Sequence, residues 1–290
     1  MAYYCQECGY KSLKWFGRCP ECGAWNTFVE EKESKDKKKA TFEKAKVQKL
    51  SEIIFKPQKR LKTGLTEFDQ VLGGGIVSSS LILIGGDPGI GKSTLLTQIA
   101  GLLSEGNVKV VYVSAEESLE QISLRVERLK INRDFYFISD TNLTSILETV
   151  EEIKPQLLII DSIQTVYLPE LESSPGGVSQ VRECANVLMR LAKEKGIIVI
   201  LVGHITKGGI IAGPKILEHL VDVVLYLEGE KETGFRILRA VKNRFGPVNE
   251  IGVFLMTEEG RYPPLLNMKT FSYQKKEGYF CVIVRNKDLF

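Results

Sequence analysis

The chain has 290 residues, of which 43% are hydrophobic and 26% are charged, and its formal net charge at pH 7 is +3. This composition predicts a soluble globular protein with one large core and room for a small additional domain. The sequence has neither a long apolar run nor the basic-then-apolar start of a signal peptide, so we expect no membrane span and a cytoplasmic location. So small a net charge does not by itself indicate a nucleic-acid partner.

The chain begins with a cysteine pattern that is typical of a metal site. Cys5, Cys8, Cys19 and Cys22 form two C-x-x-C pairs, and a glycine follows the second cysteine of each pair. Such turns let four thiolates converge on one Zn²⁺ ion. Disulfide bonds are the alternative, but they do not fit a chain without an export signal. We therefore predict a four-cysteine zinc ribbon over residues 1–30.

Aromatic and basic side chains are interleaved in the predicted ribbon. Trp15 and Trp25 lie near Lys11, Lys14 and Arg18. These side chains could stack on bases and hold phosphates, or the tryptophans could simply cover the metal site. The residues alone leave both interpretations open.

A charged linker is expected over residues 31–49, and a second domain over residues 50–270. In that domain short apolar runs alternate with longer amphipathic ones, which predicts an α/β fold with a mostly parallel sheet covered on both faces. Predicted strands lie at 81–85, 108–115, 135–139, 156–162 and 197–204, and predicted helices at 92–105, 118–130, 143–153 and 179–196. The strand-like segments 222–229, 234–243 and 250–256 are expected to be antiparallel or at the edge.

A glycine-rich turn stands between the strand at 81–85 and the helix at 92–105. It matches the P-loop pattern G-x-x-x-x-G-K-[ST] in the required strand-turn-helix context. We expect its backbone amides and Lys92 to bind the phosphates of ATP, and Ser93 to be a ligand of Mg²⁺. The predicted nucleotide-binding residues are Gly86, Asp87, Pro88, Gly89, Ile90, Gly91, Lys92, Ser93 and Thr94.

Two carboxylate positions downstream fit ATP hydrolysis. Asp161 ends an apolar strand, where a carboxylate can hold Mg²⁺ through water, although a helix N-cap is the alternative. Glu116 and Glu117 follow another apolar strand, and one of them can orient the attacking water as general base. A capping role for this segment is also open, since Ser114 stands three residues before Glu117.

Several motifs together resemble the bacterial RadA family, also called Sms. They are the segments 63–75, 86–94, 112–118, 159–166, 203–207 and 241–246, in this order along the chain. The resemblance implies a RecA-like P-loop ATPase core preceded by the zinc ribbon, and a DNA-dependent ATPase that acts in recombinational DNA repair. It further implies a hexameric ring on single-stranded DNA that promotes branch migration, and Glu116 as the catalytic glutamate. Ala115 and Asp87 are conservative departures from the family pattern.

The segment "KNRFG" at 242–246 is specific to this resemblance. Lys242 and Arg244 stand two positions apart, so on a strand both point to one face. The resemblance implies that they reach the γ-phosphate held by a neighbouring subunit. Solvated strand charges and a DNA contact are the alternatives.

Two polar, glycine-containing loops are candidates for contact with single-stranded or branched DNA. One covers 168–183, and the other covers 204–219 and carries Lys207 and Lys215. His204 ends a strand near the expected γ-phosphate and is either a polar sensor or a structural residue. The resemblance also implies a recombinase or helicase as partner of the zinc ribbon.

The last residues, 271–290, fit the family poorly, and we expect them to be a truncated remnant without the Lon-protease-like domain of the family. Two functions of different classes follow. One is a DNA-dependent motor ATPase. The other is a nucleotide-switched module that binds DNA or protein without productive turnover.

Overall fold

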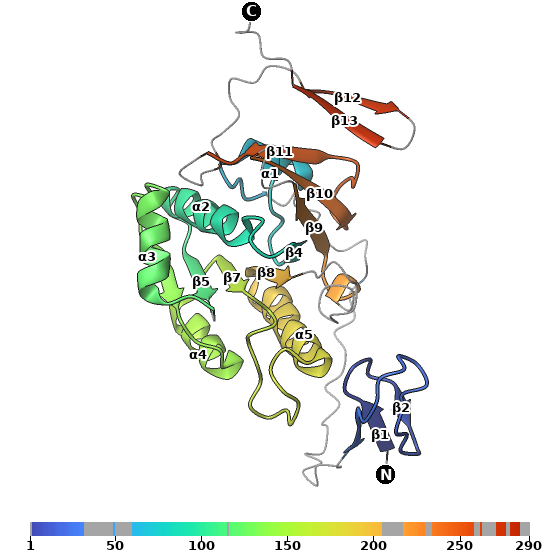
Figure 1. Cartoon of the computed structure of the whole chain (residues 1–290). Coiled ribbons are helices and arrows are strands. Elements are labelled where there is room, and N and C mark those ends of the chain that lie inside the picture. Colours follow the sequence, from blue (N-terminus) through green and yellow to red (C-terminus); the bar gives the residue numbers. More distant parts are fainter. Residues whose placement is uncertain are drawn as a thin grey trace, which may run out of the picture.

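The structure is a computed structural model that describes residues 2–31, 49, 60–114, 116–204, 217–229, 234–257, 262, 271–276 and 279–284 (Figure 1). The expected linker at 31–49 lies almost entirely outside these residues. Among the helices of this described part, none combines the length and the apolar character needed to cross a bilayer.

The cysteine-rich segment folds as a small antiparallel sheet. Its strands are β1 (Ala2–Cys5), β2 (Lys11–Ser12) and β3 (Phe28–Glu31), in the order β2-β1-β3. Cys5 ends β1, and Cys8 lies in the turn between β1 and β2. The ribbon is thus built from the chain that carries the four predicted ligands.

The second unit is built on an eight-stranded sheet with the order β11-β10-β9-β4-β8-β7-β5-β6. The strands are β4 (Leu81–Gly86), β5 (Val110–Ser114), β6 (Tyr136–Ile138), β7 (Leu157–Asp161), β8 (Ile198–His204), β9 (Val223–Glu228), β10 (Phe235–Asn243) and β11 (Ile251–Leu255). The predicted mostly parallel α/β sheet is confirmed, since β4 to β9 are parallel.

Five helices accompany this sheet in the described residues. They are α1 (Thr66–Val71), α2 (Lys92–Glu105), α3 (Leu119–Arg128), α4 (Leu143–Ile153) and α5 (Val178–Lys195). The amphipathic runs predicted four of them, whereas α1 was not expected from the sequence. Ser114 does not cap α3, because the N-cap residue is Ser118.

Both faces of the sheet are buried, as continuous apolar strands require. Along β4, Ile82 and Ile84 join the cluster that contains α1, α2 and α3 residues, while Leu81 and Leu83 join the cluster that contains α4 and α5 residues. Figure 1 shows the strands enclosed by these helices. This packing fixes the strand ends that carry the polar residues of the site.

The C-terminal strands differ in part from the expectation. β10 and β11 are antiparallel and form one end of the sheet, as predicted. β9 is instead an internal strand, parallel to β4 and antiparallel to β10. Within the predicted remnant at 271–290, β12 (Phe271–Lys276) and β13 (Tyr279–Val284) pair as an antiparallel hairpin, drawn in red in Figure 1.

Candidate functional site

The carboxyl ends of the parallel strands meet at one edge of the sheet, which we call the carboxyl edge. Gly86 at the end of β4 lies beside His204 at the end of β8, and Ser114 at the end of β5 lies beside Asp161 at the end of β7. Glu116 follows directly after this edge. The register therefore brings the glycine-rich loop and the predicted carboxylates into the crevice where open α/β sheets bind ligands.

The loop from β4 to α2 approaches its neighbours so closely that two glycines have no room for a side chain. At Gly86, where φ is 153°, an added Cβ would lie 2.4 Å from the Leu227 carbonyl oxygen. At Gly91, where φ is 111°, it would lie 2.2 Å from the Tyr262 hydroxyl oxygen. Gly91 is also the N-cap of α2, where no side chain caps the helix. The amides of the first helical turn therefore remain available to an anion.

The other predicted loop residues differ in exposure. Asp87, Pro88 and Gly89 are exposed, and Ser93 and Thr94 are half-buried. Ile90 is buried in the core, and its carbonyl oxygen accepts a hydrogen bond of 3.0 Å from Arg236 Nε. The loop is thus anchored at Ile90 and open to solvent at the three residues before it.

Lys92 is buried at the start of α2. Its Nζ donates to the carbonyl oxygens of Gly86 at 2.9 Å and Asp87 at 3.0 Å. Burial lowers the pKa of Lys92, while Asp161 and other nearby carboxylates act in the opposite direction. Phosphate oxygens are stronger acceptors than carbonyl oxygens. The ammonium group is therefore placed to exchange its carbonyl partners for phosphate.

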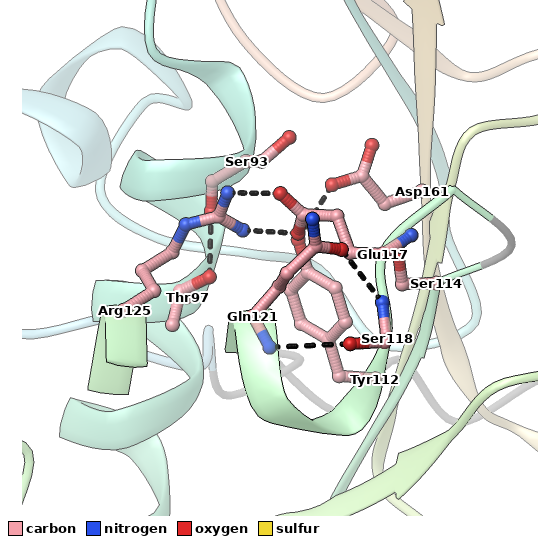
Figure 2. A network of polar contacts seen from close by, with 9 residues as sticks. All are labelled: Ser93, Thr97, Tyr112, Ser114, Glu117, Ser118, Gln121, Arg125 and Asp161. Carbon is pink, nitrogen blue, oxygen red and sulfur yellow. Dashed lines mark hydrogen bonds and ion pairs between the residues drawn. The ribbon is translucent and has the colours of Figure 1, made fainter. Parts of the chain in front are cut away.

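Asp161 is the most enclosed carboxylate of the site. It is only 5% exposed, and its Oδ2 accepts a hydrogen bond of 2.6 Å from the hydroxyl of Tyr112, a fully buried residue of β5. Burial raises the pKa of Asp161, whereas hydrogen bonds from the Ser93 and Tyr112 hydroxyls lower it. Figure 2 shows the Asp161 and Ser93 side chains close together. A carboxylate and a hydroxyl in this position fit the oxygen ligands that Mg²⁺ prefers.

Glu117 is fully engaged by another side chain. Arg125 of α3 donates to both of its carboxylate oxygens, at 2.5 Å to Oε2 and with a very short contact to Oε1 (Figure 2). The Glu117 amide donates to Ser114 Oγ at 3.2 Å. Glu117 is therefore held in place, with its carboxylate turned toward Arg125.

Glu116 is more exposed than Glu117, and its carboxylate lies beside residues at the ends of β7 and β8. Its Oε1 accepts a hydrogen bond of 2.7 Å from Ser162 Oγ and lies 3.4 Å from His204 Nε2. Its side chain is 45% exposed. This arrangement fits the choice of Glu116 over Glu117 as general base, and it places His204 next to that base.

Lys242 and Arg244 lie away from the carboxyl edge. Lys242 pairs with Val224 after a register shift in β10, and Arg244 follows the end of that strand. Through β9, Val224 pairs with Leu83 of β4. Arg244 is therefore level with the start of β4, about 16 Å along the strand from Gly86 at 3.3 Å per residue. The Arg244 side chain cannot reach the phosphate site of its own subunit from there, and Lys242 is level with Leu83, about 10 Å along the strand from Gly86 and two strands away.

Both cations have partners within the chain. Lys242 Nζ donates to the Glu218 carbonyl oxygen at 2.6 Å, and Arg244 Nη1 donates to Asp222 Oδ1 at 3.2 Å. Asp222 is almost completely buried, and its other oxygen binds Lys193 Nζ at 2.7 Å. Asp222 thus holds two cationic side chains, a role that the sequence analysis did not predict. An aspartate directly before the β9 strand was the available signal.

A cavity of about 320 Å³ lies beside the P-loop on the side of β9 and β10. Asp87, Tyr226, Glu228 and Arg239 line it together with Gly86, Ile90, Leu227 and Gly229. Arg239 binds both oxygens of Glu228, at 2.7 and 2.9 Å. Of the two carboxylates that line the cavity, Glu228 is paired with Arg239, and Asp87 of the P-loop is the other.

The four predicted zinc ligands converge. The Sγ atoms of Cys5, Cys8, Cys19 and Cys22 all lie within 4.8 Å of one another. Hydrogen bonds of 2.9 Å from the Gly9 amide to the Cys5 carbonyl and from the Gly23 amide to the Cys19 carbonyl close the two turns. Four thiols in this arrangement fit a tetrahedral Zn²⁺ ion, which would be a structural ion here.

The two tryptophans of the ribbon are exposed. The cysteines pack against Phe28 and Tyr3, whereas Trp15 and Trp25 are 53% and 69% exposed. Trp15 Nε1 donates to the Phe28 carbonyl oxygen at 3.1 Å, and the Arg18 guanidinium lies over the Trp25 ring at 5.7 Å. Both rings therefore present a large surface to solvent, as stacking on bases would require.

The first candidate DNA loop, between β7 and α5, is tied to the buried side chain of Gln180. Gln180 Nε2 donates to the carbonyl oxygens of Leu168, Leu171 and Ser173, at 3.1, 3.3 and 2.9 Å. The second candidate DNA loop, with Lys207 and Lys215, lies outside the described residues.

Together, the strand order, the glycine-rich loop and the convergent carboxylates define a P-loop nucleotide-binding protein of the RecA-like fold, joined to a zinc ribbon. The sequence model of the AAA domain family matches residues 49–209, and that of the rubredoxin metal binding domain matches residues 3–30. The chain belongs to the AAA domain family.

Curated proteins agree with this assignment. The DNA repair protein RadA of Bacillus subtilis is 51% identical over 284 residues, and that of Listeria monocytogenes is 48% identical over 281 residues. Each comparison covers 95% of this chain and 62% of the relative, so the chain spans less than two thirds of their length. The predicted resemblance to the RadA family is confirmed by these sequence identities.

The fold of the second unit also matches solved structures. A DnaB-like replicative helicase has a TM-score of 0.61 at 16% identity, covering 70% of this chain and 61% of that chain. A KaiC-like protein from Pyrococcus horikoshii has a TM-score of 0.58 at 22% identity, covering 70% of this chain and 98% of that chain. At such low identities the similarity shows the fold alone, and it confirms the RecA-like prediction.

Proposed function

We propose that this chain is a DNA-dependent ATPase that acts in recombinational DNA repair, binds single-stranded and branched DNA, and promotes branch migration. The observation that carries the ATPase part is the convergence of Lys92, Asp161 and Glu116 at the carboxyl edge. The similarity to proteins named for DNA repair supports the DNA part.

Each side chain of the site has a distinct task in this proposal. The loop amides and Lys92 hold the triphosphate, and Ser93 and Asp161 would hold Mg²⁺, which neutralises phosphate charge. Glu116 accepts a hydrogen bond from the attacking water and turns it toward the γ-phosphorus. Its position next to Ser162 and His204 supports this task, because both neighbours restrict how the carboxylate can turn.

A neighbouring subunit completes the site in the proposed ring. Arg244 lies level with the start of β4 and Lys242 level with Leu83 in its middle, so we assign both to the nucleotide of another copy. Contact between opposite edges of two copies is a head-to-tail interface, and such interfaces close into rings when the rotation allows it. The cavity beside Asp87 offers space and an acidic side chain for an incoming cation.

ATP hydrolysis with and without single-stranded DNA tests the proposal. We expect DNA at low salt to stimulate turnover, and Lys92→Ala to abolish ATP binding because it removes the buried ammonium group. Lys195→Gln, at a surface ion pair on the far edge, is the matched control and should behave as wild type. Turnover that DNA does not change would exclude DNA from the mechanism.

A nucleotide-switched binding module is the second candidate. The observation that favours it is that Lys242 and Arg244 are already bound within their own chain, to Glu218 and Asp222. If no neighbour docks, residual turnover should not change in Arg244→Ala. If the ring forms, the same variant should lose about a 1000-fold factor in kcat, the usual contribution of a trans-acting arginine.

A further inference from the structure

Three carboxylates gather at the carboxyl edge, and each has a different partner. Asp161 binds the Tyr112 hydroxyl, Glu117 binds the Arg125 guanidinium, and Glu116 binds the Ser162 hydroxyl. Glu116 and Glu117 are adjacent in the turn from β5 to α3, yet their carboxylates are held by different neighbours. The contact that holds Glu117 therefore bears on which of the two can act as the base.

The start of α3 places Arg125 for this task. Ser118 and Gln121 form a capping box, in which the Ser118 amide donates to Gln121 Oε1 at 2.9 Å and the Gln121 amide donates to Ser118 Oγ at 3.4 Å (Figure 2). Such a box satisfies two free amides and so defines where the helix starts. The direction of α3 then brings Arg125, two turns into the helix, back over Glu117.

The pairing is well shielded and uses the whole carboxylate. The Arg125 side chain is 15% exposed and that of Glu117 is 25% exposed. A bidentate ion pair between a guanidinium and a carboxylate fixes the orientation of the carboxylate and compensates its charge. Both oxygens of Glu117 are consequently engaged by the guanidinium, which holds the carboxylate turned toward α3.

Resting on the proposed ATPase function, we infer that Arg125 is a positioning residue that withholds Glu117 from the attacking water and so leaves Glu116 as the free base of this pair. Without Arg125, Glu117 would be an unpaired carboxylate in a partly buried place. Its carboxylate would be free to turn toward Asp161 and the crevice, where it would compete with Glu116 for the attacking water. The loss should therefore affect kcat more than substrate binding.

The test compares wild type with Arg125→Gln, Glu117→Gln, the double variant of both, and Lys195→Gln as a helix-borne cation control. Steady-state kcat and KM for ATP are measured for each, with binding of a non-hydrolysable ATP analogue and thermal melting as checks of the folded site. We expect Arg125→Gln to lose about 10- to 100-fold in kcat, as misplaced catalytic groups do, with analogue affinity changed less than about 3-fold. The double variant should regain kcat to within about 3-fold of Glu117→Gln, because the released carboxylate is gone.

The outcomes separate this inference from the function on which it rests. Wild-type kcat in Arg125→Gln, or a double variant as slow as Arg125→Gln, would overturn the role of Arg125. If Arg125→Gln does not fold, the double variant, which has no unpaired charge, decides by the same criterion. Absence of turnover in the wild type would instead overturn the proposed ATPase function.

Discussion

Replacing Gly91 by alanine should disrupt the P-loop for two separable reasons. The backbone there has φ 111°, which side chains other than glycine rarely adopt and which costs about 1–3 kcal/mol. The new Cβ would also lie 2.2 Å from the hydroxyl oxygen of Tyr262, a fully buried side chain. Overpacking of this kind costs a further 1–3 kcal/mol or so. We therefore expect Gly91→Ala to lower the free energy of unfolding by about 2–6 kcal/mol and to abolish ATP binding.

Tyr262 cannot move aside easily. Its ring packs edge-on against Phe254, and its backbone exchanges two hydrogen bonds with the Gln98 side chain, of 2.9 and 2.5 Å. Tyr262→Phe removes the closest clashing atom but leaves the backbone strain, while Met256 Cε, 2.6 Å from the new Cβ, is the end of a flexible side chain that can move aside. The double variant Gly91→Ala/Tyr262→Phe should hence recover about half of the lost stability.

Urea denaturation followed by circular dichroism measures these differences. Gly106→Ala is the matched control at the other end of α2, because φ is −80° there and the nearest atom is a carbonyl oxygen 3.3 Å away. Its stability should differ from wild type by no more than about 1 kcal/mol. A Gly91→Ala variant as stable as Gly106→Ala would refute the reasoning, and so would a double variant without any recovery.

Three further predictions concern other parts of the chain. Tyr112→Phe removes the hydrogen bond to Asp161, so it should lower stability by about 1–3 kcal/mol and raise the Mg²⁺ concentration needed for half-maximal ATP turnover; an unchanged magnesium titration would contradict this. Burial and then the Glu183 charge raise the pKa of Cys184 from 9.0 to about 12. The folded domain therefore favours the neutral thiol, so this contribution to stability is complete below pH 9 and is lost as the pH rises toward 12. Urea denaturation across this range should show a free energy of unfolding that falls less steeply with pH in Cys184→Ala than in wild type. Both tryptophans lie in the ribbon, so a zinc chelator should shift tryptophan emission while the melting temperature of the ATPase unit stays constant; a parallel loss of both signals would contradict independent folding.

Local patterns predicted much of the fold and the loop chemistry. The helix expected at 92–105 matches α2, and that expected at 143–153 matches α4, because amphipathic periodicity and the P-loop are both readable along a short stretch. The four converging thiols likewise follow from their spacing.

The rest depends on tertiary neighbours that spacing does not reveal. β9 was expected to be antiparallel or at the edge, but an apolar run carries no information on strand direction, and β9 lies inside the sheet. The Tyr112 contact with Asp161 exists only because β5 pairs with β7. The partners of Glu117 and Arg244 likewise come from elements that meet through packing.

The Gln180 side chain has a consequence for any ligand of the loop at 168–173. A single buried amide holds three carbonyl groups of this loop with no partner present. A strand of nucleic acid that settles on it would meet a preformed surface, and little conformational entropy would be lost on association. Recognition at this loop would then depend on shape more than on induced ordering, and Gln180→Ala would slow capture even though no atom of that residue touches the ligand.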